Sequence, residues 1–312
     1  MNDSTRLALV TGHEFGRRAF EGILSSEEYL AGRLEAPVMI GLPSSRAGGT
    51  VGYRSIADLA EQEGSDFHEA GDGSLIGLSD VLSSHEPHFI LVIGWSRLVH
   101  PEILALPEEL HGRDDGPRRS AGCVGMHPTR LPDGRGQAPI PWTVIKGRRE
   151  TALSVFFLEA QADTGPLIAQ HGLEVRTGET ASSLFHRFAQ VHGEAGSALA
   201  RQLAARSVPA ETQADDDASR WPKRRPDDGR IDHMMSVGEV DRLVRALLGP
   251  YPRAFAPIEG RNIPVRRVRR TVPGEASTVA EAAEDVVRFG CRDGVVELER
   301  DDRPRTSTQR PR

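Results

Sequence analysis

Phe89–Gly94 reads FILVIG and is the most apolar run in the chain. Two similar runs precede it, Arg6–Thr11 (RLALVT) and Pro37–Leu42 (PVMIGL), and segments with helical spacing of apolar residues separate the three. Strands that are apolar throughout are typical of a parallel sheet covered by helices on both faces. The sequence therefore predicts an α/β domain with a mostly parallel sheet.

Predicted strands continue after Gly94, and a different pattern of short strands begins toward the end of the chain. Further strands are expected at Gly122–Met126, Thr151–Leu158 and Leu167–Glu174, and a helix over Thr180–Ser197. After a polar, proline-bearing connection and a helix at Val237–Leu248, short apolar runs recur between turns, at residues 254–258, 263–268, 286–289 and 295–298. Such spacing predicts a small β-rich, OB-like domain.

The domain boundaries follow from these changes. We expect an α/β domain over residues 1–210, a linker and connecting helix over 211–244, a β-rich domain over 245–302 and a disordered tail over 303–312.

Composition narrows the class of protein. The 312 residues carry a net charge of −6, which disfavours a nucleic acid as the main partner. No window approaches the 18 apolar residues of a membrane span, and the first residues lack a signal-peptide pattern, so a cytoplasmic protein without a membrane partner is expected. Cys123 and Cys291 lie far apart and predict buried free thiols. We expect no metal ion.

Two polar residues stand where chemistry is expected. His127 ends a predicted strand and precedes a proline, and Asp163 opens an Asp-Thr-Gly turn after the next strand. Ligand sites of open α/β sheets lie at the carboxyl ends of strands. An imidazole and a carboxylate that meet there can perform acid–base chemistry near neutral pH.

Three motifs follow one another along the chain: HPTRLP from His127, GRGQAPIPW from Gly134 and DTG from Asp163. In this order they resemble the folate-dependent formyltransferases. GWSRLV from Gly94, with Ile103 and Leu104, resembles the family's cofactor loop, and KRRPDDGRID from Lys223 resembles its domain junction. The resemblance covers roughly residues 5 to 300.

The resemblance implies a Rossmann-like domain that transfers a formyl group from 10-formyltetrahydrofolate to a primary amine. His127 and Asp163 would be catalytic, with the imidazole near the oxyanion and the carboxylate relaying a proton. Thr129 and Arg135 would lie in the substrate loop. The folate would contact two loops, through Trp95, Arg97, Leu98, Val99, Leu104, Leu158, Ala160, Ala162 and Gly165.

One position departs from the family. The family usually has Asn-x-His, whereas this chain has Gly125-Met126-His127 and so lacks the amide that positions the formyl oxygen. Loss of one oxyanion donor commonly costs about 10²–10³ in rate. Thr129 or a water can replace it, the enzyme can be slow, or the chain can be a folate-binding protein with a disabled site. We favour an active enzyme, because His127, Arg135 and Asp163 are all present.

The acceptor amine stays open. Residues 245–312 hold 14 Arg, no Lys and 10 acidic residues, a net charge of +4, so the rest carries −10. Arg261–Arg270 contains five arginines, which could bind the phosphates of methionyl-tRNA, so this acceptor is kept as a less favoured alternative. Arginines in this pattern are also typical of the solvent-exposed face of a small sheet. GRGQAPIPW looks closer to amino-sugar formyltransferases, so an amino-sugar nucleotide is preferred. Its diphosphate would bind Arg17, Arg18 or Lys146. A hydroxyornithine-type amine is also compatible, and a homodimer is left open.

Overall fold

The computed structural model describes residues 4–114, 116–214, 216–249 and 251–301. The predicted tail at 303–312 lies outside the described residues. The chain divides into two compact units. The first comprises residues 1–136, 152–173 and 187–220, and the second comprises 137–151, 174–186 and 221–312.

A seven-stranded sheet forms the centre of the first unit within the described residues. In spatial order its strands are β3 (Phe67–Glu69), β2 (Val38–Gly41), β1 (Leu7–Val10), β4 (Phe89–Val92), β6 (Gly122–His127), β8 (Glu150–Phe157) and β9 (Leu167–Glu174). The pairs from β3 to β6 are parallel, and β8 runs antiparallel to β6. The predicted mostly parallel α/β sheet is therefore confirmed.

Helices cover both faces of this sheet. They are α1 (Glu14–Leu24), α2 (Glu27–Leu30), α3 (Ala57–Glu63), α4 (Ser79–His85), α5 (Pro101–His111) and α7 (Ala181–Ala204), with short 3-10 turns η1 (Ser44–Gly49) and η2 (Ile76–Leu78). Leu82 of α4 and Ile103 of α5 join one core cluster with alternate residues of the strands, among them Val10 and Ile90. The opposite face is covered by α1, α3 and α7.

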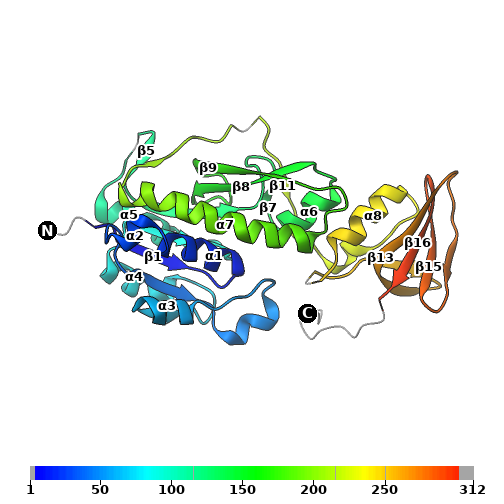
Figure 1. The fold of residues 1–312 in the computed structure, drawn as a ribbon, viewed down its shortest axis with the longest axis horizontal. Coiled ribbons are helices and arrows are strands. Elements are labelled where there is room, and N and C mark those ends of the chain that lie inside the picture. The colour runs from blue at the N-terminus through cyan, green and yellow to red at the C-terminus, as the bar shows by residue number, and fades with distance from the viewer. Residues whose placement is uncertain (1–3, 115, 215, 250, 302–312) are drawn as a thin grey trace. The chain divides into compact units, whose positions relative to one another are not determined.

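Helix α1 lies directly beside α7, as Figure 1 shows. A β-carbon on Gly22 would overlap the carbonyl of Gly193, and one on Gly196 would overlap the carbonyl of Ala19. The two helix backbones therefore touch, which only glycine permits. Arg17 of α1 also pairs with Asp58 of α3, so the three helices form one layer.

The second unit contains a five-stranded antiparallel sheet. Its strands in spatial order are β12 (Phe255–Ile258), β13 (Arg261–Pro273), β16 (Gly294–Arg300), β15 (Val286–Cys291) and β14 (Ala280–Ala282). The edge strands β12 and β14 approach each other, so the sheet curls toward a barrel. Helices α6 (Pro139–Ile145) and α8 (Val237–Ala246) and the turn η3 (Pro226–Gly229) complete the unit. The predicted β-rich C-terminal region is confirmed.

Several elements differ from their predicted form. Helices α5 and α6 and the short strands β3 and β14 were not predicted. Strand β13 has 13 residues, about twice the expected length, and its pairing with β16 contains two register shifts of the kind that β-bulges produce. Two-residue ribbons, β5 (Arg118–Arg119) with β10 (Val208–Pro209) and β7 (Arg135–Gly136) with β11 (Arg220–Trp221), were also not predicted.

Both cysteines are buried and free, as predicted. Burial raises the pKa of the Cys123 thiol far above its usual range, so this thiol is unreactive. Among the described helices, none is long and apolar enough to span a bilayer.

Candidate active site

His127 lies at the carboxyl end of β6, a strand that is buried along its whole length. The residue is 7% exposed, and its Nε2 lies 2.9 Å from the carbonyl oxygen of Gly134. A carbonyl can only accept a hydrogen bond, so in the neutral imidazole Nε2 carries the proton. Nδ1 is then the nitrogen that can take up another.

Asp163 provides the carboxylate beside this nitrogen. Its Oδ1 lies 3.8 Å from His127 Nδ1, and its Oδ2 accepts a 2.8 Å hydrogen bond from the backbone N–H of Gly136. A distance of 3.8 Å is too long for a direct hydrogen bond, but it leaves two groups that can each accept a proton at close range. The predicted meeting of His127 and Asp163 is thus present in the structure.

The route of the chain to Asp163 depends on strand direction. Because β8 is antiparallel to β6, Phe157 at its end pairs with Val124, upstream of His127. Leu158 N–H donates to the Cys123 carbonyl at 2.8 Å, and the following loop then returns along β6 to bring Asp163 to His127.

Gly165 makes this return sharp. A β-carbon at position 165 would overlap the carbonyl oxygen of Phe157, while Phe157 N–H donates to the Pro166 carbonyl at 2.9 Å. Glycine is thus required here by a close approach within the chain itself. Its predicted contact with the folate stays a prediction.

The loop after His127 is held by two side chains of neighbouring strands. Ser154 of β8 donates to the Thr129 carbonyl at 2.7 Å and accepts from Leu131 N–H at 3.1 Å. Gln170 of β9 donates to the Leu131 carbonyl at 2.7 Å. The Leu131–Pro132 peptide bond is cis. Thr129 is buried, and its Oγ1 lies 3.4 Å from the Gly134 carbonyl, so its hydroxyl is only weakly engaged.

Sequence analysis did not identify Gln213, which lies in the connection after β10. Its amide oxygen accepts from Arg135 Nε and Nη2 at 3.2 and 2.9 Å, and its amide nitrogen donates to the carbonyls of Asp163 and Gly165 at 3.0 and 2.7 Å. The residue lies in a polar, acidic stretch without a motif, so no sequence signal marks it.

The residues predicted to contact folate lie in two places. Trp95, Val99, Leu104 and Leu158 are partly buried and pack against the core cluster that contains Cys123. Leu98 is 72% exposed, and Arg97 is exposed near Gly73. Ala160 and Ala162 lie in the loop between β8 and β9. Leu104 belongs to helix α5 and not to a loop.

Leu158 also explains the glycine that replaces the family's asparagine. A β-carbon on Gly125 would lie 2.6 Å from Leu158 Cδ2 and 3.3 Å from its Cγ. The space that a side chain at 125 would occupy is therefore filled by leucine, and no side-chain amide can stand there unless Leu158 moves.

We expect Gly125→Ala to lower the free energy of unfolding by about 1–2 kcal/mol, because the new methyl displaces Leu158 from its packing against the core cluster. In a Leu158→Ala background the same change should cost nothing. Urea unfolding of the four proteins measures the coupling. Equal costs in both backgrounds would show that Leu158 does not occupy this space.

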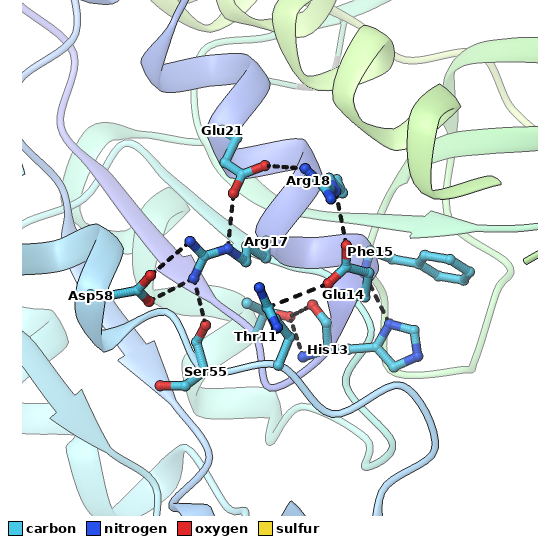
Figure 2. Close-up of polar contacts among 10 residues, drawn as sticks. Thr11, His13, Glu14, Phe15, Arg17, Arg18, Glu21, Ser55 and Asp58 are labelled. Atoms are coloured by element: carbon cyan, nitrogen blue, oxygen red, sulfur yellow. Dashed lines mark hydrogen bonds and ion pairs between the residues drawn. The ribbon is translucent and has the colours of Figure 1, made fainter. Parts of the chain in front are cut away.

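The predicted diphosphate ligands Arg17 and Arg18 are engaged within the protein (Figure 2). Arg17 makes a two-point ion pair with Asp58 at 2.6 and 2.8 Å and also bonds Glu21 and the Ser55 carbonyl. Asp58 and Glu21 raise the pKa of Arg17 above its ordinary value. Arg18 pairs with Glu14 and Glu21. Lys146, in the second unit, lies over the rings of Trp142 and Trp221.

Two histidines flank the Phe15 ring near the start of α1. His13 caps this helix by accepting from Phe15 N–H, and Phe15 stacks on His192 of α7 with ring centroids 4.3 Å apart. Burial lowers the pKa of His13 to about 4 and that of His192 to about 3. Both imidazoles are therefore neutral at physiological pH.

This burial predicts acid sensitivity. In the unfolded chain both groups titrate near pH 6.5, so below that pH the unfolded state binds more protons, and stability falls as pH decreases. Between pH 6.5 and 5 each histidine should remove about 2 kcal/mol from the free energy of unfolding. His192→Phe should flatten the pH dependence measured by urea unfolding. An unchanged slope in that variant would contradict the prediction.

Comparison with known proteins agrees with the geometry. The sequence matches the family "Formyl transferase" over residues 74–199 and "Formyl transferase, C-terminal domain" over residues 223–308. A methionyl-tRNA formyltransferase from Myxococcus xanthus is 27% identical over 221 residues, which cover 70% of this chain and 67% of that protein.

Solved structures share the whole fold. A sugar 3N-formyl transferase solved in the presence of dTDP and 5-N-formyl-THF is 13% identical with a TM-score of 0.68, covering 97% of this chain and 99% of that one. An N-formyltransferase from Helicobacter canadensis, 13% identical, gives 0.69 over 95% of this chain and 99% of that one. Methionyl-tRNA formyltransferase from Clostridium thermocellum, 17% identical, gives 0.57 over 95% and 100%. With both domains matched, the chain belongs to the family of folate-dependent formyltransferases.

Proposed function

We propose that this enzyme transfers the formyl group of 10-formyltetrahydrofolate to a primary amine of an amino-sugar nucleotide. The observation that carries the transfer chemistry is the buried pair of His127 Nδ1 and Asp163 Oδ1, 3.8 Å apart at the end of β6. The sugar-nucleotide acceptor is supported by the GRGQAPIPW block and by two similar solved structures, a sugar 3N-formyl transferase with dTDP and an N-formyltransferase in complex with dTDP-3-aminofucose.

The reaction needs a proton to move at each step. The neutral amine nitrogen attacks the formyl carbon, and the resulting tetrahedral intermediate carries an oxyanion and a protonated amine. Asp163 accepts the amine proton. The bond from the formyl carbon to the folate nitrogen then breaks, and that nitrogen takes a proton from the His127–Asp163 pair. Formylated amine and tetrahydrofolate are released.

The oxyanion must be stabilised without the family's asparagine. Thr129 is the candidate donor from this chain, because its hydroxyl is buried in the loop after His127 and only weakly bonded to Gly134. A protonated His127 would add positive charge at the same place.

Folate binding is proposed for the two predicted loops and also for Arg46 of η1, which sequence analysis did not identify. Arg97 and Arg46 both approach Gly73, their nearest side-chain nitrogens 3.2 and 3.6 Å from where a β-carbon would be. Arg46 bonds the Asp72 carbonyl, and neither arginine forms an ion pair within the part of the chain that the structure describes. Two such guanidinium groups suit the carboxylates of the folate's glutamate.

The test is turnover by the purified protein. We expect tetrahydrofolate to be released from 10-formyltetrahydrofolate when a dTDP- or UDP-linked amino sugar is supplied. Methionyl-tRNA and hydroxyornithine complete the panel. Turnover with one of these instead would correct the acceptor. Binding of 5-formyltetrahydrofolate without turnover of any amine would overturn the enzymatic proposal.

Methionyl-tRNA is the second candidate, since the Myxococcus xanthus relative is named for it. Of the arginines on β13, Arg266 pairs with Glu299 and Arg269 with Asp285. Arg261, Arg267 and Arg270 are exposed without an ion pair among the described residues. This leaves few charges for a phosphate backbone, so the small acceptor stays preferred.

A further inference from the structure

Asp163 adopts a backbone conformation that must be stabilised from outside. Its φ is +62°, in the left-handed region that residues other than glycine rarely occupy. Such a conformation persists only where the surroundings determine it. The carbonyls of Asp163 and Gly165 on either side of the turn both need donors, and both receive them from Gln213.

Gln213 closes a ring of hydrogen bonds. Its oxygen accepts from Arg135, and its nitrogen donates to Asp163 and Gly165. Asp163 Oδ2 in turn accepts from the N–H of Gly136, the residue after Arg135. The Gln213 amide thus joins the loop after His127 to the Asp-Thr-Gly turn. Asp163 is held from both segments, through its carbonyl by Gln213 and through its carboxylate by the Gly136 N–H.

The chemistry of the ring requires an amide. Arg135 can only donate, so it needs an oxygen, and the two carbonyls can only accept, so they need N–H groups. A carboxylate would satisfy Arg135 but would turn its second oxygen toward two carbonyl oxygens. At 7% exposure, water cannot readily replace the missing bonds.

We propose that Gln213 is a positioning residue that sets the Asp163 carboxylate at its working distance from His127. The inference rests on the proposed function and adds a residue to it. A carboxylate displaced by about 1 Å can lose about 10²-fold in rate.

The first test is kinetic and uses the full chain. Gln213→Glu keeps the shape of the side chain and its bond to Arg135, and we expect kcat to fall about 10–100-fold with little change in the dissociation constant of 5-formyltetrahydrofolate. Gln62→Glu, on the exposed face of α3, introduces the same charge and should not change kcat.

A double-mutant cycle separates positioning from general support of the fold. If Gln213 acts through Asp163, Gln213→Glu should cost less than 2-fold in an Asp163→Asn background. A full additional 10–100-fold loss there would overturn the proposal, as would an unchanged kcat in the single variant.

A second measurement does not depend on turnover. The N–H of Gly136 is bonded to the Asp163 carboxylate, so its hydrogen exchange reports the position of that group. We expect exchange at Gly136 to be at least about tenfold faster in Gln213→Glu and Gln213→Ala than in the wild type or Gln62→Glu. Unchanged exchange would overturn the positioning role. If exchange at Gly136 is faster in the Gln213 variants but the wild-type protein turns over no amine, the positioning role of Gln213 stands and the proposed function is rejected.

Discussion

Asp163→Asn should reduce formyl transfer by about 10²–10⁴-fold, the range expected when a general acid–base group is removed. The amide has the shape of the carboxylate, can still accept from Gly136 N–H, and tolerates the left-handed conformation at φ +62°. It cannot accept the proton of the attacking amine. The fold and the affinity for 5-formyltetrahydrofolate should therefore be preserved while kcat collapses.

Asp80→Asn is the matched control, because Asp80 is an exposed residue in the first turn of α4, outside the site. Its kcat should equal that of the wild type. Steady-state kinetics and titration with 5-formyltetrahydrofolate measure both quantities. If Asp163→Asn kept more than a tenth of the wild-type kcat, the proton would have to leave by a group other than this carboxylate.

Gly165→Ala should be the most destabilising substitution among those considered. The added methyl would overlap the Phe157 carbonyl, a backbone atom in a central strand that cannot move aside. Either the Phe157–Pro166 hydrogen bond breaks or the turn carrying Asp163 is pushed outward. We expect a loss of about 3 kcal/mol or more in the free energy of unfolding, and a site without activity.

Gly71→Ala provides the comparison, because no atom lies within 4 Å of where its β-carbon would be and the residue is exposed. It should change the midpoint of thermal unfolding by little. A Gly165→Ala protein with the wild-type midpoint would show that the chain does not approach Phe157 this closely in solution.

The inner parallel strands of the first unit could be predicted from the sequence because all their residues are buried. The first four residues of FILVIG form β4, and each residue of β1, β2 and β4 is buried, as continuous apolar runs require. Helix α6 was not predicted, because two prolines lie at its start, at positions 139 and 141. In the structure they occupy its first turn, where proline costs no hydrogen bond.

The site was predicted in part, and its residues show why. His127 and Asp163 were found because strand ends and tight turns leave local patterns in the sequence. Gln213 leaves none: its importance depends on two carbonyls 48 and 50 residues away and on a guanidinium 78 residues away. Arg17 illustrates the opposite error, since a basic residue near a predicted site turned out to be engaged by Asp58 and Glu21.

The sequence by itself determined the layered α/β architecture and the β-rich C-terminal region. It also marked His127 and Asp163, the pair that we propose for the acid–base chemistry, because apolar periodicity and turn chemistry are local properties. Only the tertiary structure decided that β8 runs antiparallel to β6, that its loop doubles back to His127, that Leu158 fills the space beside Gly125 and that Gln213 holds the Asp163 turn. Each of these depends on contacts between distant segments, and such contacts form only when the chain is packed.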